Sequence, residues 1–232
     1  MKRYRRIVIG ATFYGCGVAA REPETLILES SSLPGTDFTT VFLPGREWSH
    51  PLKHPAANRF RQMLVKNGIL QREKLQTGGL VPIFSQWCLE QKLQIEFLSN
   101  IIRKENNRIT VQSPAGITEF FSEEILDAEL QNPKKYLTAL LSHPAKMFET
   151  LIYPEYRIVS GPFPDESCLM MEFPREKTWT MSRIAFFNAW NRRPPELREW
   201  TLVLIGTRFA FDIFPNPAVA LDCGLSGGSY EL

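Results

Sequence analysis

A short run of glycines near the amino terminus has the spacing of a phosphate-binding turn. Gly10 and Gly15 occupy the first and third glycine places of a G-x-G-x-x-G pattern, and Thr12 occupies the middle place. In that pattern the first glycine makes a tight turn, the second lets a pyrophosphate approach the backbone, and the third lets a helix pack on a strand. Glu29 lies nineteen positions after Gly10, close to the ~20 at which an acid binds a ribose diol. These residues therefore indicate that a dinucleotide is held by backbone amides and one carboxylate.

A strand, a helix and a second strand must position these residues, and the sequence contains all three. Residues 6–9 are a short apolar, β-branched run, which is typical of a strand buried on both faces of a parallel sheet. A helix is predicted over residues 13–21, because Pro23 prevents its continuation. Residues 25–28 are a second apolar strand that ends in Glu29. Free amides and the helix dipole favour a phosphate at the amino end of such a helix.

Two other interpretations of this stretch stay open. In one, the glycines only ease the packing of the helix on the sheet. In the other, the basic residues 1–6 and the apolar segment that ends at residues 19–20 form a secretory signal. We favour the strand, helix and strand unit. Three glycines, Thr12 and Tyr14 make a poor apolar helix, and a signal would leave Glu29 at its expected distance by accident.

The composition is that of an ordinary globular protein. The chain has 232 residues, of which 44% are hydrophobic and 22% charged, and its net charge is +2. Basic residues are interspersed with acids and no run of 18 apolar residues occurs, so we expect neither nucleic-acid binding nor a membrane span. Four cysteines lie apart, without the spacing of a zinc site. They predict a reducing, cytoplasmic compartment and no bound metal. The oligomeric state stays open.

The rest of the chain predicts further helices and a second group of strands. Helical periodicity marks residues 56–67 and 80–91. Short strands separated by turns then predict an antiparallel meander, with strands at 93–103, 108–112, 116–121 and 124–127. In the second half the expected strands are 137–141, 167–173 and 200–214, and the expected helix is 178–190. We therefore predict an α/β protein. A Rossmann-like domain with a parallel sheet and a β-meander covers residues 1–129, and a mixed α+β substrate-side domain covers residues 130–232.

Three segments of the first domain carry a resemblance to a known family. They are IVIGATFYGCGVA leading to LILES, IEFLSNIIRKE, and ITEFFSEEILDAE. In these segments, which span about residues 4–129, the chain resembles the glutathione-reductase-like FAD-dependent oxidoreductases, in a bacterial branch. The resemblance implies that FAD is the cofactor and that hydride or electrons pass through its flavin to or from a substrate that the sequence does not name.

The resemblance also assigns residues to the cofactor, although none of them is catalytic. The turn from Gly10 to Gly15 would cradle the pyrophosphate, Glu29 would bind the adenosine ribose, and Ile101 would meet the adenine edge through its backbone. Ala128 would lie near the pyrophosphate from the other side, and Ser30 can add a hydrogen bond beside Glu29. The candidate cofactor-binding residues are thus Gly10, Ala11, Thr12, Phe13, Gly15, Glu29, Ser30, Ile101 and Ala128.

The chain departs from the family's pattern at three places. Thr12 replaces a glycine, Glu129 and Leu130 stand where the family commonly has Thr and Gly, and we find no late Gly-Asp segment of the kind that closes the FAD site. We therefore expect a family member that lacks its C-terminal FAD-closing segment. Two alternatives to an FAD oxidoreductase follow. One is a non-enzymatic remnant that binds nucleotide weakly or serves as an interaction scaffold, and the other is a protein that binds a nicotinamide or another adenosyl ligand.

Overall fold

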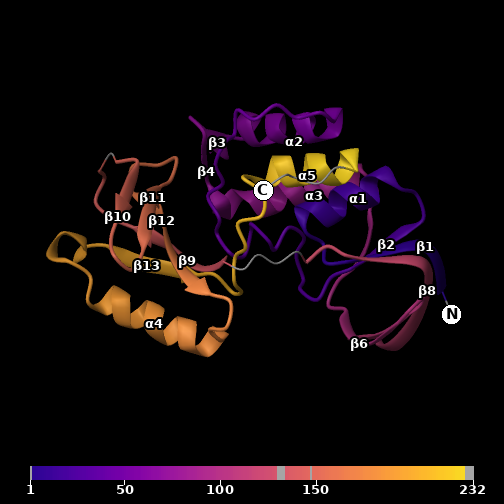
Figure 1. The fold of residues 1–232 in the computed structure, drawn as a ribbon. Coiled ribbons are helices and arrows are strands. Elements are labelled where there is room, and N and C mark those ends of the chain that lie inside the picture. Colours follow the sequence, from indigo (N-terminus) through magenta and orange to yellow (C-terminus); the bar gives the residue numbers. More distant parts are fainter. Residues whose placement is uncertain (1, 130–133, 147, 228–232) are drawn as a thin grey trace.

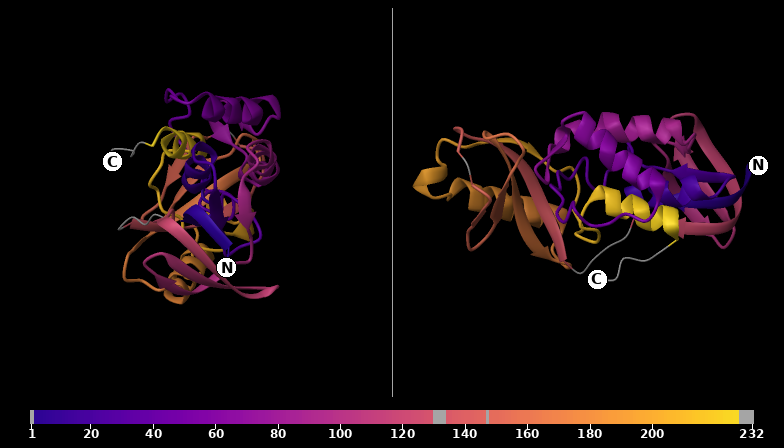
Figure 2. Two further views of the ribbon diagram at one scale, coloured as in Figure 1. Left: turned by 90° about the vertical axis from the view of Figure 1, so that its right-hand side faces the viewer. Right: turned by 90° about the horizontal axis from the view of Figure 1, so that it is seen from above.

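The computed structural model describes residues 2–129, 134–146 and 148–227. Over these residues the chain forms a six-stranded sheet, a five-stranded sheet and a small two-stranded hairpin. The two larger sheets lie side by side along the length of the molecule; several helices cover the six-stranded sheet, and α4 lies against the five-stranded one (Figure 1, Figure 2). Leu130 and residues 228–232, to which the sequence analysis refers, lie outside the described residues.

The six-stranded sheet belongs to the amino-terminal half of the chain. Its strands, in spatial order, are β5 (Gln94–Glu96), β2 (Thr25–Leu28), β1 (Lys2–Ile9), β8 (Gly116–Asp127), β7 (Arg108–Ser113) and β6 (Asn100–Glu105). Neighbours from β5 to β8 pair in parallel, whereas β8, β7 and β6 pair antiparallel. The predicted Rossmann-like sheet with its β-meander is therefore confirmed.

The central strands of this sheet are buried on both faces because successive side chains point in opposite directions. Val8 and Ile27, both fully buried, belong to the core on the helical side of the sheet. Ile7 and Leu28 belong to a separate core, in which the meander covers the other face. This two-sided burial explains why the first two strands read as continuous apolar runs and not as an alternating pattern.

Four helices gather on one side of the six-stranded sheet, with α2 outermost (Figure 1). They are α1 (Phe13–Arg21), α2 (Pro55–Lys66), α3 (Leu80–Glu90) and α5 (Pro217–Ser226). Between α2 and α3 lie β3 (Leu70–Gln71), β4 (Lys74–Leu75) and the 3₁₀ turn Thr77–Gly79. The core that these helices share is aromatic, since Phe13, Phe60, Phe84 and Trp87 are all fully buried. The rings of Phe13 and Phe84 stack with their centroids 3.8 Å apart.

The five-stranded sheet forms the second half of the chain and is antiparallel throughout. Its strands, in spatial order, are β10 (Thr150–Ile152), β11 (Arg157–Ser160), β12 (Glu166–Pro174), β9 (Lys134–Ser142) and β13 (Thr201–Ile205). The helix α4 (Trp179–Asn191), capped by the Thr178 hydroxyl, and the 3₁₀ turn Pro195–Leu197 complete this unit. It has a core of its own, which includes Leu137, Met171 and Phe186.

Two of the predicted strands are too long. The run 93–103 divides into β5 and β6, because Leu98 adopts a left-handed backbone (φ +56°) and the chain turns there between two places in the sheet. The run 200–214 contains only β13. After Gly206, whose amide still donates to the Thr138 carbonyl, the amide of Thr207 donates to the Thr40 carbonyl at 3.0 Å. The chain then meets β9 once more, in a single bridge between Ala210 and Tyr136. Residues 206–216 therefore lead back toward the first unit.

The last helix, α5, belongs to the first unit in space, although the predicted boundary at residues 129 and 130 assigned it to the second. It crosses α1 at two glycines. A Cβ on Gly17 would lie 2.5 Å from the Leu221 carbonyl oxygen, and one on Gly224 would lie 2.2 Å from the Tyr14 carbonyl oxygen. Because no side chain separates them there, the backbones of α1 and α5 lie in direct contact. The domain prediction is corrected in this respect.

Asn216 fixes the start of α5, and we expect its replacement to be costly. Its side-chain oxygen accepts from the Val219 amide at 3.0 Å, and its side-chain nitrogen donates to the carbonyls of Arg46 and Glu47, at 3.0 and 3.2 Å. The residue is 1% exposed. Asn216→Ala should lower the free energy of unfolding, measured in urea, by about 2 kcal/mol. Asn216→Asp keeps the cap and loses both donated bonds, so its free energy of unfolding should lie between those of the parent and Asn216→Ala. Equal stability of Asn216→Ala and the parent would contradict this role.

Candidate functional site

The turn from β1 into α1 lies at the carboxyl end of the parallel strands, where open α/β sheets bind ligands. Gly10 has φ +91°, and a Cβ there would lie 2.7 Å from Cγ of Glu129. A Cβ on Gly15 would lie 2.6 Å from the Gly10 carbonyl oxygen and 2.8 Å from Cβ of Ala128. Both glycines are thus required by close approach of the turn, the helix and the end of β8.

Thr12, in the middle glycine place, is the N-cap of α1. Its hydroxyl accepts from the Gly15 amide at 2.9 Å and donates to the Ala128 carbonyl at 3.2 Å. It is 5% exposed. The threonine therefore ties the first turn of the helix to the end of β8 instead of leaving bare backbone, and its methyl group lies 3.6 Å from where a Gly10 Cβ would be.

Glu29 is fully buried at the end of β2. One carboxylate oxygen accepts from the Ala11 amide at 2.8 Å and the other from the Ser31 amide at 2.7 Å. Its own amide and carbonyl pair with Glu96 and Ser99. In this conformation the carboxylate joins the β1–α1 turn to the loop after β2, and no part of it faces solvent.

Asp37, which the sequence analysis did not single out, lies at the amino end of α1. Both of its carboxylate oxygens accept from the Phe13 amide, at 3.2 and 3.3 Å. The pKa of this carboxyl group is raised to about 7, mainly by burial; the charge of Glu29 also raises it, whereas the Phe13 amide and Arg208 lower it. Its sequence context, an acid in a loop rich in Ser, Gly and Thr, carries no signal of this position.

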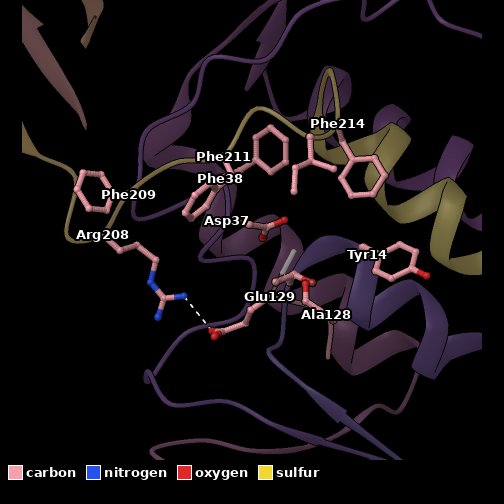
Figure 3. A pocket seen from close by; sticks show the side chains of 11 residues that line it. Tyr14, Asp37, Phe38, Ala128, Glu129, Arg208, Phe209, Phe211 and Phe214 are labelled. Atoms are coloured by element: carbon pink, nitrogen blue, oxygen red, sulfur yellow. Dashed lines mark hydrogen bonds and ion pairs between the residues drawn. The ribbon is translucent and has the colours of Figure 1, made fainter. Parts of the chain in front are cut away.

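A cavity of about 100 Å³ opens beside Asp37, between the turn, the end of β8 and the returning segment 206–216 (Figure 3). Its polar side chains are Thr12, Asp37, Glu129 and Arg208. The Arg208 guanidinium pairs with the Glu129 carboxylate at 3.2 Å and donates to the Thr36 hydroxyl at 3.2 Å. The remaining wall is mostly aromatic, with Ala128 and Ile213 as its aliphatic members.

The aromatic wall comes mainly from the returning segment, which the sequence analysis read as part of a strand. Phe211 and Phe214 line the cavity together with Phe38 and Tyr14. The rings of Tyr14 and Phe214 stack with centroids 5.8 Å apart. In the sequence this wall is indicated by the phenylalanines at positions 209, 211 and 214. Aromatic residues at such spacing are equally typical of a buried core.

A second hollow of about 210 Å³ adjoins the cavity and shares Phe38 with it. Arg46, Arg157 and Asp212 line it, next to apolar residues of the second sheet. Asp212 pairs with Arg46 at 3.4 Å. Arg208 therefore lines the first cavity and Asp212 the second, and both lie after the end of β13.

The structure brings most of the predicted cofactor residues together. Those that meet around the amino end of α1 and the end of β2 are Gly10, Ala11, Thr12, Phe13, Gly15, Glu29, Ser30 and Ala128. The ring of Phe13 points into the aromatic core and only its backbone faces the site. Ile101 lies apart, on β6, and packs with the core on the meander side of the sheet. The backbone nearest Glu29 from that region is the amide of Ser99.

Two kinds of feature are lacking in the part of the chain that the structure describes. Within residues 2–129, 134–146 and 148–227, no group of three or more His, Cys, Asp or Glu side chains is placed to hold a metal ion. Over the same residues no helix has both the length and the hydrophobicity to cross a membrane.

Comparison with known proteins gives matches among solved structures alone. No protein-family model matches the chain, and no curated protein matches it. A flavoprotein/dehydrogenase from Cytophaga hutchinsonii is similar with a TM-score of 0.55 and 14% identity, over 98% of this chain and 77% of that one. Glycine oxidase from Geobacillus kaustophilus has a TM-score of 0.59 and 9% identity, over 100% and 97% of the two chains.

A third similar structure is the myxobacterial chondrochloren halogenase CndH, described as a variant of FAD-dependent halogenases. Its TM-score is 0.58 and its identity 13%, over 92% of this chain and 64% of that one. At these identities the similarity concerns the fold. The chain therefore has the Rossmann-like α/β fold that these proteins share.

Proposed function

We propose that this chain binds FAD at the amino end of α1 and that it serves oxidation and reduction through the flavin. The observation that carries the proposal is the position of the aromatic cavity. It lies at the carboxyl ends of β1 and β8, against the first turn of α1, in a fold shared with a flavoprotein/dehydrogenase and an FAD-dependent halogenase. Ligands of open α/β sheets bind at this edge.

The backbone of the site fits a dinucleotide. Gly10 has a backbone angle that favours glycine, Gly15 allows the helix to approach the turn, and α1 directs its amino end at the cavity. On this proposal the amides from Gly10 to Gly15 face the pyrophosphate, with Ala128 opposite. Glu29 and Ser30 lie nearest the adenosine ribose. The flavin supplies the electron chemistry, and the phenylalanine rings of the returning segment exclude water from it.

The side chains in this conformation do not fit the whole cofactor. Glu29 is fully buried, and each of its carboxylate oxygens already accepts a hydrogen bond from a backbone amide. The Phe13 amide already donates to the Asp37 carboxylate. The cavity of about 100 Å³ is smaller than the roughly 300–1,000 Å³ of ligand pockets. Binding of FAD therefore requires the loop after β2 to move away from α1.

The test is a visible absorbance spectrum of the purified protein, before and after incubation with FAD and desalting. A retained flavin band supports the proposal. No retained flavin and no saturable quenching of FAD fluorescence would overturn it, and a stability shift with NAD or S-adenosylmethionine alone would point to another adenosyl ligand. A protein that carries no flavin and whose stability changes with none of these ligands would favour the non-enzymatic scaffold.

A further inference from the structure

The carboxylate of Asp37 occupies the place at the amino end of α1 that a phosphate would need. Helix amino ends bind anions through their free amides, and here both Asp37 oxygens face the Phe13 amide, at 3.2 and 3.3 Å. Two further amides of the first turn are engaged within the chain: that of Gly15 donates to the Thr12 hydroxyl, and that of Cys16 donates to the Thr12 carbonyl. The chain thus places an anion of its own where a diphosphate would bind.

The loop after β2 holds Asp37 firmly in this position. The amide of Gly35 donates to the Ala11 carbonyl at 2.6 Å, and the amides of Phe38 and Thr39 donate to the Gly35 carbonyl, at 3.0 and 2.8 Å. Gly35 has φ +72°, and a Cβ there would lie 2.6 Å from the Phe13 ring. Asp37 is therefore built into the site by a compact turn that packs directly on α1.

The charges around the cavity also oppose a diphosphate. In the described part of the chain no ion pair joins Asp37 to a basic side chain, and Glu129 lines the same cavity. The one cation there, Arg208, is paired with Glu129. A bound diphosphate would bring further negative charge beside two carboxylates, which is unfavourable.

We propose that Asp37 determines which ligands this site accepts: its ionised carboxylate excludes a diphosphate from α1, and protonation or displacement of Asp37 admits one. The inference rests on the proposed function, because it concerns the same site and takes FAD as the diphosphate. It adds that the affinity for FAD is set by one carboxyl group of the chain.

The inference predicts that the affinity for FAD depends on pH. The groups that face Asp37 are Glu29 from the end of β2, Glu129 after β8, Arg208 after β13, and Tyr14 and Cys16 on α1. The pKa of Asp37 is about 7, whereas the diphosphate diester of FAD does not titrate near neutral pH. The negative charge of bound FAD would raise the Asp37 pKa further, so we expect the affinity to fall, about tenfold, as the pH rises from about 6 to about 9.

The experiment compares the parent protein with Asp37→Asn, by quenching of FAD fluorescence at about pH 6 and about pH 9, on either side of the Asp37 pKa of about 7. Asparagine keeps the size and one acceptor and removes the charge. We expect Asp37→Asn to bind FAD about tenfold more tightly than the parent at the higher pH and to lose the pH dependence. Asp165→Asn, an exposed acid of the second unit, is the matched control and should behave like the parent.

A second readout does not depend on FAD. Folding raises the pKa of Asp37 from its ordinary value of 3.8 to about 7. The folded protein therefore binds this proton more tightly than the unfolded chain, and stability falls as the pH rises between these values. Asp37→Asn should remove that part of the fall, so its thermal stability should exceed that of the parent above the Asp37 pKa.

The outcomes separate the two proposals. If parent and Asp37→Asn bind FAD with the same affinity and the same pH dependence, the inference about Asp37 is overturned and FAD binding stands. If both variants are folded and neither binds FAD at any pH, the proposed function is overturned and the inference with it. An unchanged dependence of stability on pH in Asp37→Asn would also contradict the placement of Asp37 at the helix.

Discussion

Gly224→Ala in α5 should lower the free energy of unfolding by about 3 kcal/mol, the cost of overpacking a close contact. The added Cβ would lie 2.2 Å from the Tyr14 carbonyl oxygen and 2.8 Å from the Val18 amide nitrogen, and both belong to the backbone of α1. Neither atom can yield without moving the helix. The loss is expected although alanine favours a helix more than glycine does by roughly 1 kcal/mol.

The control for this prediction is Gly78→Ala, in the 3₁₀ turn between β4 and α3. There the nearest atom to an added Cβ is a side-chain nitrogen of Gln76 at 3.5 Å, so the change should stay within about 0.5 kcal/mol. Unfolding in urea measures both variants. Similar stabilities of the two would mean that α5 does not pack backbone to backbone on α1, and the assignment of α5 to the first unit would fail.

Glu29→Ala should also destabilise the protein strongly, by about 3 kcal/mol. The substitution removes the acceptor of the Ala11 and Ser31 amides, whose bonds to the carboxylate are 2.8 and 2.7 Å long, and Glu29 has no exposed surface. Each amide would then be left without a partner in a site closed to water. Binding of adenosine nucleotides should weaken as well, by about 1 to 3 kcal/mol, if Glu29 meets the ribose.

Two comparisons distinguish these roles of Glu29. Glu29→Gln keeps one acceptor oxygen and should recover about half of the stability, whereas Glu119→Ala, at an exposed position of β8, should change stability by less than about 0.5 kcal/mol. Stability is read from urea unfolding and affinity from FAD fluorescence. A Glu29→Ala protein of normal stability would show that the two buried amides do not depend on the carboxylate.

The first unit could be predicted in detail because its signals are local. Residues 6–9 form a strand since they are β-branched and apolar, and the helix predicted over residues 13–21 is found at Phe13–Arg21. A side-chain cap at Thr12 starts this helix and Pro23 follows its end. Each of these effects acts within a few residues, so the sequence alone shows them. The helix α4 and the antiparallel strands of the meander were predicted on the same basis, although the expected strands 116–121 and 124–127 form the single strand β8.

Tertiary structure decided what occupies the amino end of α1. The sequence predicted free amides there and a carboxylate, Glu29, available to a ligand. The structure instead buries Glu29 between two amides and places Asp37 at the Phe13 amide, across 24 positions of the chain. Whether a carboxylate meets a ligand or its own backbone depends on which loop packs over it, and no local pattern determines that.

The sequence by itself determined the order of elements and hence the α/β fold of the first unit, because strand burial, capping and helix termination are short-range effects. Only the tertiary structure decided where the chain after Gly206 goes. That segment leads back from the second sheet, lines the cavity with phenylalanine rings, and ends in α5 against α1. Gly17 and Gly224 make this contact across more than two hundred positions. Two small residues indicate a helix crossing only when their partners are known, which is why the crossing could not be predicted.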